Sequence, residues 1–324
     1  AHVPACGEQH AVRSSRSAAG MVAAMDDFSD KLAVITGGAN GMGRELARQL
    51  AAEGCDVAIC DLSEDDMAVT AAQIREEAVN IRITTHVADV GDEEAILRFR
   101  DEVVAQHETD HVELVFNNAG ISGGGSLFDS TREAWDRCFD VVWGGVYWGT
   151  RAFLPLLTAA SEGHLINTSS VNGFWASLGP DRPHTAYSAA KFAVKGFPEA
   201  LIADLRIQAP HVGVSVVMPG HIGTKIVESS IRHGVVGDLG AEEKALFELA
   251  AADFETNALT SAAEAATIIL DGVRENRWRI LVGPDAVALD EVVRARPEDV
   301  YGEAGMEAVM AAFQASGDGS VLEK

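Results

Sequence analysis

Short apolar runs alternate with longer stretches of helical period from Lys31 onward, and this alternation constrains the fold more than any other feature. Strands that alternate with helices along a chain are typical of βαβ units and a parallel sheet. We predict seven strands, which begin at Leu32, Asp56, Ile81, His111, His164, Val212 and Arg279. Because crossovers between parallel strands are right-handed, a doubly wound sheet with helices on both faces is the most economical arrangement. The sequence therefore predicts a single α/β domain of the Rossmann type.

The predicted domain occupies residues 26–284 and leaves a segment at each end of the chain. Within it, residues 222–260 are longer than one crossover requires, so we expect helices there that cover the carboxyl edge of the sheet as a lid and bind substrate. Residues 285–324 show one or two amphipathic helical patterns, which pack either on the same subunit or on a neighbour. Residues 1–25 are rich in Ala and Ser, and we interpret them as a disordered or artificially added extension, with a transit peptide as the alternative.

The charge balance limits the partners of the chain. It has 49 acidic and 25 basic residues, which gives a formal net charge of −24 at pH 7. Such a charge repels phosphate backbones and anionic lipid surfaces, so we predict a small-molecule substrate and neither a nucleic acid nor a membrane partner. The four cysteines, Cys6, Cys55, Cys60 and Cys138, have no spacing typical of a metal or redox site. We therefore expect no metal and a cytoplasmic location.

A glycine-rich segment, TGGANGMG at Thr36–Gly43, follows the first predicted strand and opens the first helix. Glycines let the backbone approach a pyrophosphate, and the free N–H groups and dipole of the helix attract its charge. The second strand ends at Asp61, whose carboxylate can accept both ribose hydroxyls and would repel a 2′-phosphate. Asn40 and Leu62 bring no basic group to hold such a phosphate. We therefore predict NAD rather than NADP; the alternative for Asp61 is a helix cap, for which Ser63 is better placed.

A phenol and an ammonium lie four residues apart in YSAAKFAV, where Tyr187 and Lys191 share one face of a predicted helix. A cation beside a phenol favours the phenolate, which makes acid/base catalysis near neutral pH possible. Ser170 follows the fifth strand, and the carboxyl ends of parallel strands line one crevice, so we expect it to converge with Tyr187. Two hydroxyls at one place suit a substrate oxygen that changes between alcohol and carbonyl. The alternative is an amphipathic helix with a snorkelling lysine and a half-buried tyrosine.

The glycine spacing T-G-x-x-x-G-x-G and the pair Y-x-x-x-K together resemble the short-chain dehydrogenase/reductase family, in its single-domain subgroup, over residues 28–283. The resemblance implies that Tyr187 transfers the alcohol proton, that Lys191 lowers the pKa of Tyr187 and holds the nicotinamide ribose, and that Ser170 orients the substrate oxygen. It also implies a homodimer or homotetramer, with subunits paired through the helix of Tyr187 and the preceding long helix.

The same resemblance implies cofactor contacts at three further strand ends. Asp89 would contact adenine, the segment Asn117–Gly120 would lie beside the cofactor, and Ile222 and Thr224 would bind the carboxamide. The complete predicted set of cofactor-binding residues is Gly37, Asn40, Gly41, Met42, Asp61, Leu62, Asp89, Val90, Asn117, Ala119, Gly120, Tyr187, Lys191, Pro219, Gly220, Ile222 and Thr224.

Two features depart from the family pattern. Val142 stands where the family usually has an asparagine that helps to hold a water in the proton relay, and a valine cannot form that hydrogen bond. Ser170 and Tyr187 are 17 residues apart, a longer spacing than the family usually has, and we expect the additional segment to shape the mouth of the pocket. His184 in this segment is interpreted as a solvated loop residue, with a second acid/base as the alternative.

We therefore predict an NAD-dependent oxidoreductase that interconverts a secondary alcohol and a ketone on a largely apolar, medium-to-large substrate, with Trp175 as the best candidate to wall the substrate site. The alternative is a non-catalytic NAD-binding sensor or scaffold with the same fold. Val142 favours the alternative, and the intact set of Ser170, Tyr187 and Lys191 argues against it.

Overall fold

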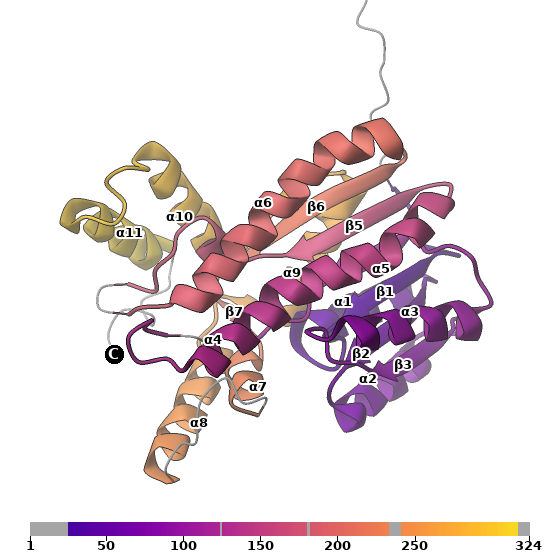
Figure 1. The fold of residues 1–324 in the computed structure, drawn as a ribbon, viewed down its shortest axis with the longest axis horizontal. Coiled ribbons are helices and arrows are strands. Elements are labelled where there is room, and N and C mark those ends of the chain that lie inside the picture. Colours follow the sequence, from indigo (N-terminus) through magenta and orange to yellow (C-terminus); the bar gives the residue numbers. More distant parts are fainter. Residues whose placement is uncertain (1–24, 124, 180–181, 233–240, 317–324) are drawn as a thin grey trace, which may run out of the picture.

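Seven parallel strands form the centre of the molecule in the residues that the computed structural model describes, 25–123, 125–179, 182–232 and 241–316. Their order across the sheet is β3-β2-β1-β4-β5-β6-β9, so the chain reverses direction across the sheet after β3 (Figure 1). The predicted doubly wound Rossmann fold is confirmed. The bounds are β1 (Leu32–Thr36), β2 (Asp56–Asp61), β3 (Ile83–Val87), β4 (Leu114–Asn117), β5 (Gly163–Thr168), β6 (Val212–Pro219) and β9 (Arg279–Val282).

Each face of the sheet is covered by its own layer of helices and its own hydrophobic core. In β1, Leu32 and Val34 join one buried cluster, whereas Ala33 and Ile35 join the other, because successive side chains of a strand point to opposite faces. One layer contains α1 (Gly41–Ala52), α2 (Glu64–Glu77) and α9 (Ala262–Arg274); the other contains α3 (Glu93–His107), α4 (Arg132–Phe139), α5 (Gly145–Ala159) and α6 (Thr185–Gln208). A π-helical turn, Asp140–Gly144, joins α4 to α5.

The strand register brings the segments that follow β1, β2, β4, β5 and β6 to one edge of the sheet. Thr36 pairs with Cys60, and Asn117 pairs with Asn167, so these strands end at the same level. The loops that leave this edge carry most of the predicted site residues. Local signals fix where the next helices begin: the Ser63 side chain accepts a hydrogen bond from the Asp66 N–H and caps α2, which confirms it as the better capping residue.

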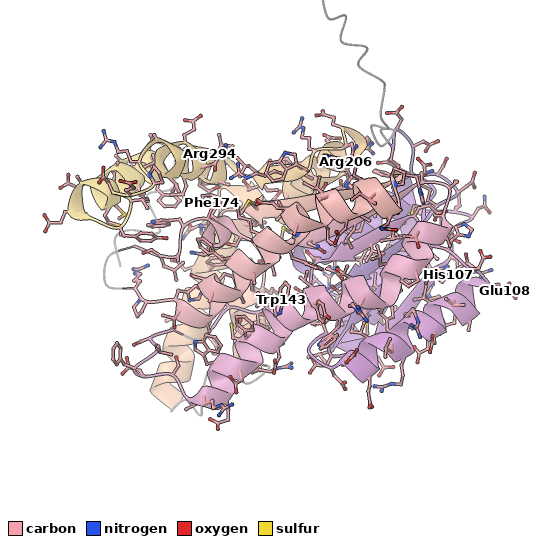
Figure 2. All side chains as sticks on the ribbon, turned by 45° about the horizontal axis from the view of Figure 1, so that its top comes forward. His107, Glu108, Trp143, Phe174, Arg206 and Arg294 are labelled. Carbon is pink, nitrogen blue, oxygen red and sulfur yellow. The ribbon has the colours of Figure 1, made fainter. Side chains whose placement is uncertain are left out.

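Two groups of helices lie at the edge where these strands end. Residues 222–260 form β7 (Ile222–Gly223), α7 (Ile226–Arg232), α8 (Ala241–Thr256) and the start of β8 (Thr260–Ser261), where β7 and β8 pair in a short parallel ribbon. The tail forms α10 (Pro284–Ala295) and α11 (Glu303–Ser316) (Figure 1). The two helices pack on each other and on the segment around Trp175 of the same chain. Figure 2 shows Phe174 beside this C-terminal pair.

The chain ends and the cysteines complete the description. Residues 1–25 were interpreted as an extension, and residues 1–24 of it lie outside the described residues. Met25 is buried in the core of the sheet face that α1 covers. Cys55, Cys60 and Cys138 are buried free thiols. In the described ranges, no helix combines the length and the apolar character that crossing a bilayer requires.

Candidate active site

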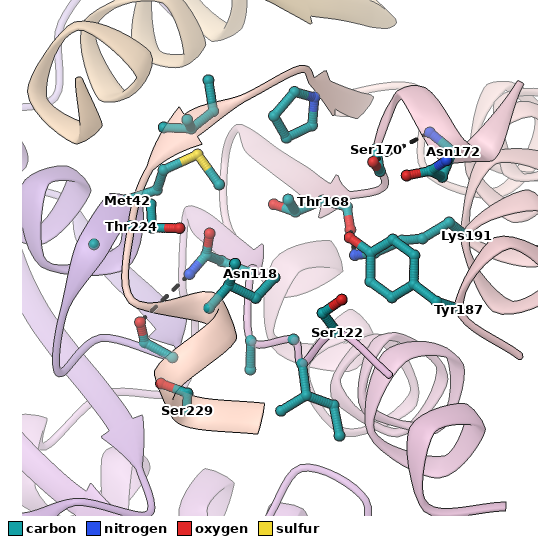
Figure 3. A pocket seen from close by; sticks show the side chains of 18 of the residues that line it. Met42, Asn118, Ser122, Thr168, Ser170, Asn172, Tyr187, Lys191, Thr224 and Ser229 are labelled. Carbon is teal, nitrogen blue, oxygen red and sulfur yellow. Dashed lines mark hydrogen bonds between the residues drawn. The ribbon is translucent and has the colours of Figure 1, made fainter. Parts of the chain in front are cut away.

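A cavity of about 410 Å³ opens at the carboxyl edge of the sheet and brings the predicted segments together (Figure 3). Met42 and Thr224 lie at one side of the view in Figure 3, and Tyr187, Lys191 and Ser170 lie at the other. All predicted site residues except Asn117 line it, namely Gly37, Asn40, Gly41, Met42, Asp61, Leu62, Asp89, Val90, Ala119, Gly120, Ser170, Tyr187, Lys191, Pro219, Gly220, Ile222 and Thr224. We call the part around the glycine loop the dinucleotide end, and the part around Tyr187 and Trp175 the substrate end.

The glycine loop has a backbone shape that side chains would prevent. Gly37 and Gly41 have positive φ angles of 68° and 54°, the left-handed region that glycine adopts without strain. A Cβ on Gly43 would lie 2.0 Å from the carbonyl oxygen of Gly37. Asn40 precedes α1 without a side-chain cap, so the first N–H groups of that helix keep their capacity to bind an anion.

Asp61 lies at the end of β2 beside this loop. Its Oδ2 accepts a hydrogen bond from the Ala39 N–H at 3.1 Å, and its Oδ1 accepts one from the Leu62 N–H at 2.8 Å. The basic side chains that line the described cavity are Lys191 and Arg137. Arg137 pairs with Asp89, with 2.8 Å between its Nη1 and the Asp89 Oδ2, and Lys191 lies at the substrate end. A carboxylate that meets no lining cation suits free ribose hydroxyls better than a 2′-phosphate.

Ser170, Tyr187 and Lys191 meet at the base of the substrate end (Figure 3). All three side chains are buried, with 7%, 8% and 3% exposure. The Lys191 Nζ donates a hydrogen bond to the Thr168 carbonyl oxygen at 2.8 Å and lies 5.4 Å from the centre of the Tyr187 ring. Ser170 caps the 3-10 helix Val171–Gly173, because its hydroxyl accepts a hydrogen bond from the Asn172 N–H at 3.1 Å.

Burial dominates the acidity of this group. It raises the pKa of Tyr187 well above the ordinary value, and a hydrogen bond with the Ser170 side chain opposes this rise. Burial also lowers the pKa of Lys191 to about 8. The sequence predicted that Lys191 depresses the pKa of Tyr187. The rise has burial as its largest cause, and an effect of Lys191 on the pKa of Tyr187 stays a prediction.

His184 was interpreted as a solvated loop residue, and that interpretation is wrong. Its side chain is buried and lines the cavity, with its ring centre 4.6 Å from that of Tyr187. Burial lowers its pKa to about 4, so the imidazole is neutral at physiological pH. The neighbouring Pro183 and Thr185 gave no sequence signal for this, because burial of a loop side chain depends on what packs over it.

Val142 is fully buried and does not line the cavity. It lies in the π-helical turn before α5 and belongs to the core cluster that also contains Cys138 and Ala190. Asn117 also lies behind the cavity wall: its Nδ2 donates hydrogen bonds to the Asn167 Oδ1 at 2.8 Å and the Thr150 Oγ1 at 3.1 Å. A cofactor contact by Asn117 stays a prediction, and its visible contacts tie β4 to β5 and α5.

Several lining residues were not predicted. Phe254 on α8 and Phe313 on α11 come from helices whose contacts no local motif reveals. Asp285 at the start of α10 is buried, and its Oδ2 accepts a hydrogen bond from the His221 N–H at 2.6 Å. A Cβ on Gly220 would lie 2.0 Å from the same oxygen, so Asp285 can approach this closely only because residue 220 has no side chain. The proline and glycine were a signal for this close approach, but they could not identify the partner.

The family of the chain follows from comparison with known proteins. A family model described as short chain dehydrogenase matches residues 31–233. The putative oxidoreductase SadH of Mycobacterium tuberculosis is 37% identical over 271 residues, which are 83% of this chain and 92% of that protein. The chain therefore belongs to the short-chain dehydrogenase family of oxidoreductases, as the two motifs predicted.

Other relatives have names that state a reaction. Levodione reductase of Leifsonia aquatica is 32% identical and aligns with 63% of this chain and 74% of its own. Cyclopentanol dehydrogenase of Comamonas testosteroni is 34% identical and aligns with 63% of this chain and 78% of its own.

A solved structure supports the fold independently. A short-chain dehydrogenase/reductase from Burkholderia phymatum, in complex with NAD, superposes with a TM-score of 0.74 at 28% identity, over 85% of this chain and 96% of that one.

Proposed function

We propose that this protein is an NAD(H)-dependent oxidoreductase that interconverts a secondary alcohol and a ketone, with Tyr187 as the acid/base and a largely apolar, medium-to-large substrate. The observation that carries the proposal is the meeting of Ser170 and Tyr187 in a cavity that also contains the glycine loop. The levodione reductase and cyclopentanol dehydrogenase relatives support a carbonyl or alcohol group as the reacting centre.

The dinucleotide end fits NAD. Gly37 and Gly43 leave the room that a pyrophosphate needs, and the uncapped start of α1 supplies N–H groups. Asp61 would hold the adenosine ribose, and Asp89, paired with Arg137, would contact adenine. The remaining predicted cofactor residues line the same cavity, except Asn117. When bound, the nicotinamide supplies or accepts a hydride at the substrate carbon.

The chain's own residues would handle the proton. Because the raised pKa keeps Tyr187 protonated, its hydroxyl can donate a proton to a ketone oxygen during reduction. Ser170 would hold the same oxygen by a hydrogen bond. In the opposite direction Tyr187 must lose its proton, and a protonated Lys191 nearby favours the phenolate. Lys191, with a pKa of about 8, carries this charge over most of the neutral range.

A non-catalytic NAD-binding role is the second candidate, and the buried Val142 favours it. At this position the chain buries an apolar side chain, which cannot hold a water by a hydrogen bond. A site that binds cofactor but lacks a route for protons would bind NADH without turnover. The intact Ser170, Tyr187 and Lys191 favour catalysis over this alternative.

NADH oxidation with a panel of aryl and alicyclic ketones tests the proposal. We expect turnover by the wild type and a loss of about a hundredfold or more in Tyr187→Phe, which is the range for a lost general acid. Tyr147→Phe is the matched control, because Tyr147 lies on α5 and does not line the cavity. NADH binding without turnover over the whole panel would support the non-catalytic role instead.

We also propose that the protein is a cytoplasmic homodimer or homotetramer. A group of partly buried aromatic side chains on the π-helical turn, α5 and α6 supports an assembly through this face. Trp143, labelled in Figure 2, packs edge-on against Phe197 at 5.4 Å and beside Tyr147 at 5.9 Å. Light scattering after gel filtration would measure the mass, and a monomer at micromolar concentration would contradict the assembly.

A further inference from the structure

The C-terminal helices α10 and α11 pack against the segment that follows Ser170. Their buried residues Leu289, Val309 and Phe313 form one hydrophobic cluster with Trp175 and Val300, and Phe174 packs against it. Figure 1 shows this pair at the far side of the molecule from α2 and β3. Both helices lie beyond the residues 31–233 that match the family model.

A direct hydrogen bond and an indirect link through Arg279 of β9 hold the tail to that segment. The Ala176 N–H donates a hydrogen bond to the Tyr301 hydroxyl at 2.9 Å. The Arg279 guanidinium lies over the Phe174 ring at 5.5 Å and pairs with Asp290 of α10. Because these contacts flank Trp175 on the sequence, they fix the position of a residue that lines the cavity.

Phe313 of α11 also reaches the cavity itself. Its ring centre lies 6.2 Å from that of Trp175, and the two side chains are 8% and 2% exposed. Further apolar lining residues are Val171, Leu178, Ile226, Val227 and Phe254, and the same cavity is also lined by polar side chains such as Ser177, His184 and Asp285. Phe313 thus contributes an apolar wall to the cavity, together with apolar side chains from the segment after β5 and from α7 and α8.

We propose that Phe313, seated on Trp175, is a specificity-determining residue that sets the outer size limit for the apolar part of the substrate. The apolar part of the proposed ketone or secondary alcohol would then pack against Phe313 and Trp175. This inference rests on the proposed function for the identity of the reacting group. A substrate with a second ring meets the Phe313 side chain.

Two ketones of different size test the size limit: cyclohexanone and 4-phenylcyclohexanone, each with NADH. We expect Phe313→Ala to raise the ratio of kcat/KM for the larger over the smaller ketone by about tenfold or more, since one apolar group in a pocket changes selectivity by about 10- to 200-fold. Phe313→Trp should shift the ratio in the opposite direction. The KM for NADH should stay unchanged in both variants, because Phe313 lies away from the glycine loop.

Val309→Ala is the matched control. Val309 lies on the same helix and in the same cluster, is fully buried, and does not line the cavity. It loosens α11 without changing the wall, so the selectivity ratio should change by less than about twofold. Equal shifts in Val309→Ala and Phe313→Ala would overturn the proposal, as would an unchanged ratio in both Phe313 variants while they remain folded by thermal unfolding.

Calorimetric binding of the same ketones to the NADH complex separates this inference from the proposed function. If wild type binds the ketones but does not reduce them, the proposed function fails, and a shift of the binding ratio by Phe313→Ala still supports the size limit. If wild type reduces both ketones and Phe313→Ala changes neither the ratio of their kcat/KM values nor the ratio of their binding constants, the size limit fails and the proposed function stands. If neither ketone binds to the wild type, both are overturned.

Discussion

The two ends of the cavity are built in different ways. At the dinucleotide end, the shape comes from the backbone: Gly37 and Gly41 adopt positive φ, and Gly43 leaves no room for a Cβ. At the substrate end, the shape comes from side chains that lie far apart in the sequence, such as Trp175 and Phe313. The comparison teaches that a substitution at the first end changes what the chain can fold into, whereas one at the second end changes what the chain can accept.

The largest expected effect is at the glycine loop. Gly43→Ala places a methyl group 2.0 Å from the Gly37 carbonyl oxygen, so we expect a loss of about 3 kcal/mol or more in the free energy of unfolding. NAD binding should weaken with it. Gly196→Ala is the control: a Cβ there meets no atom within 4 Å in α6, and we expect a gain of up to about 1 kcal/mol. Equal effects in urea unfolding would refute the contrast.

A smaller effect is expected at Asp61, which we propose to hold the adenosine ribose. Asp61→Ala combined with Leu62→Arg removes a carboxylate and adds a cation, so the ratio of the Kd values for NADH and NADPH should move toward NADPH by about a hundredfold. Asp65→Ala is the control: it removes an exposed carboxylate from the first turn of α2, four residues after Asp61, and should leave the ratio unchanged. A wild-type preference for NADPH in the same titration would contradict the assignment of Asp61.

Val142→Asn tests whether position 142 belongs to the cavity or to the core. Because Val142 is fully buried in an apolar cluster, a buried amide there should cost about 1 to 3 kcal/mol of unfolding free energy. Val142→Ala, which leaves no polar group, is the comparison for lost volume alone. Raised turnover in Val142→Asn with full stability would instead show that an amide at this position reaches the catalytic group.

The smallest expected effect is a pH dependence at the substrate end. His184 has a pKa of about 4 in the folded chain and about 6.5 when unfolded, so between these values the unfolded state binds the additional proton. Stability from this group is complete above pH 6.5 and is lost as the pH falls toward 4. His184→Phe should reduce the slope of unfolding free energy against pH in this window by about 1 kcal/mol per unit. An unchanged slope would mean that His184 is solvated.

Much of the fold was predictable because its signals are local. The strand of residues 32–36 and that of residues 56–61 were predicted with their observed bounds, since short apolar runs between turns mark buried parallel strands. The strands predicted from Ile81 and His111 begin later, at Ile83 and Leu114. Ends of strands depend on neighbouring pairs, and sequence alone places them less well.

The sequence predicted the residues of the dinucleotide end better than those of the substrate end. Glycines and strand-end residues such as Asp61 were found because the backbone geometry demands particular residue types at particular places. Phe313 and Asp285 were missed, and His184 was misread, because their positions depend on how the tail and the loop pack in three dimensions. The rise in the pKa of Tyr187 was not foreseen, since its main cause is burial, which the Y-x-x-x-K spacing does not reveal.

The most direct test of the central claim follows a hydride from one end of the cavity to the other. NADH that carries deuterium at both hydrogen positions of the nicotinamide C4 is incubated with cyclohexanone, and the alcohol is analysed by mass spectrometry. We predict an alcohol that carries the deuterium on its carbinol carbon with wild type and Tyr147→Phe, formed about a hundredfold or more slowly with Tyr187→Phe. Bound NADH without labelled alcohol from the wild type, or equal rates in Tyr187→Phe, would contradict the account.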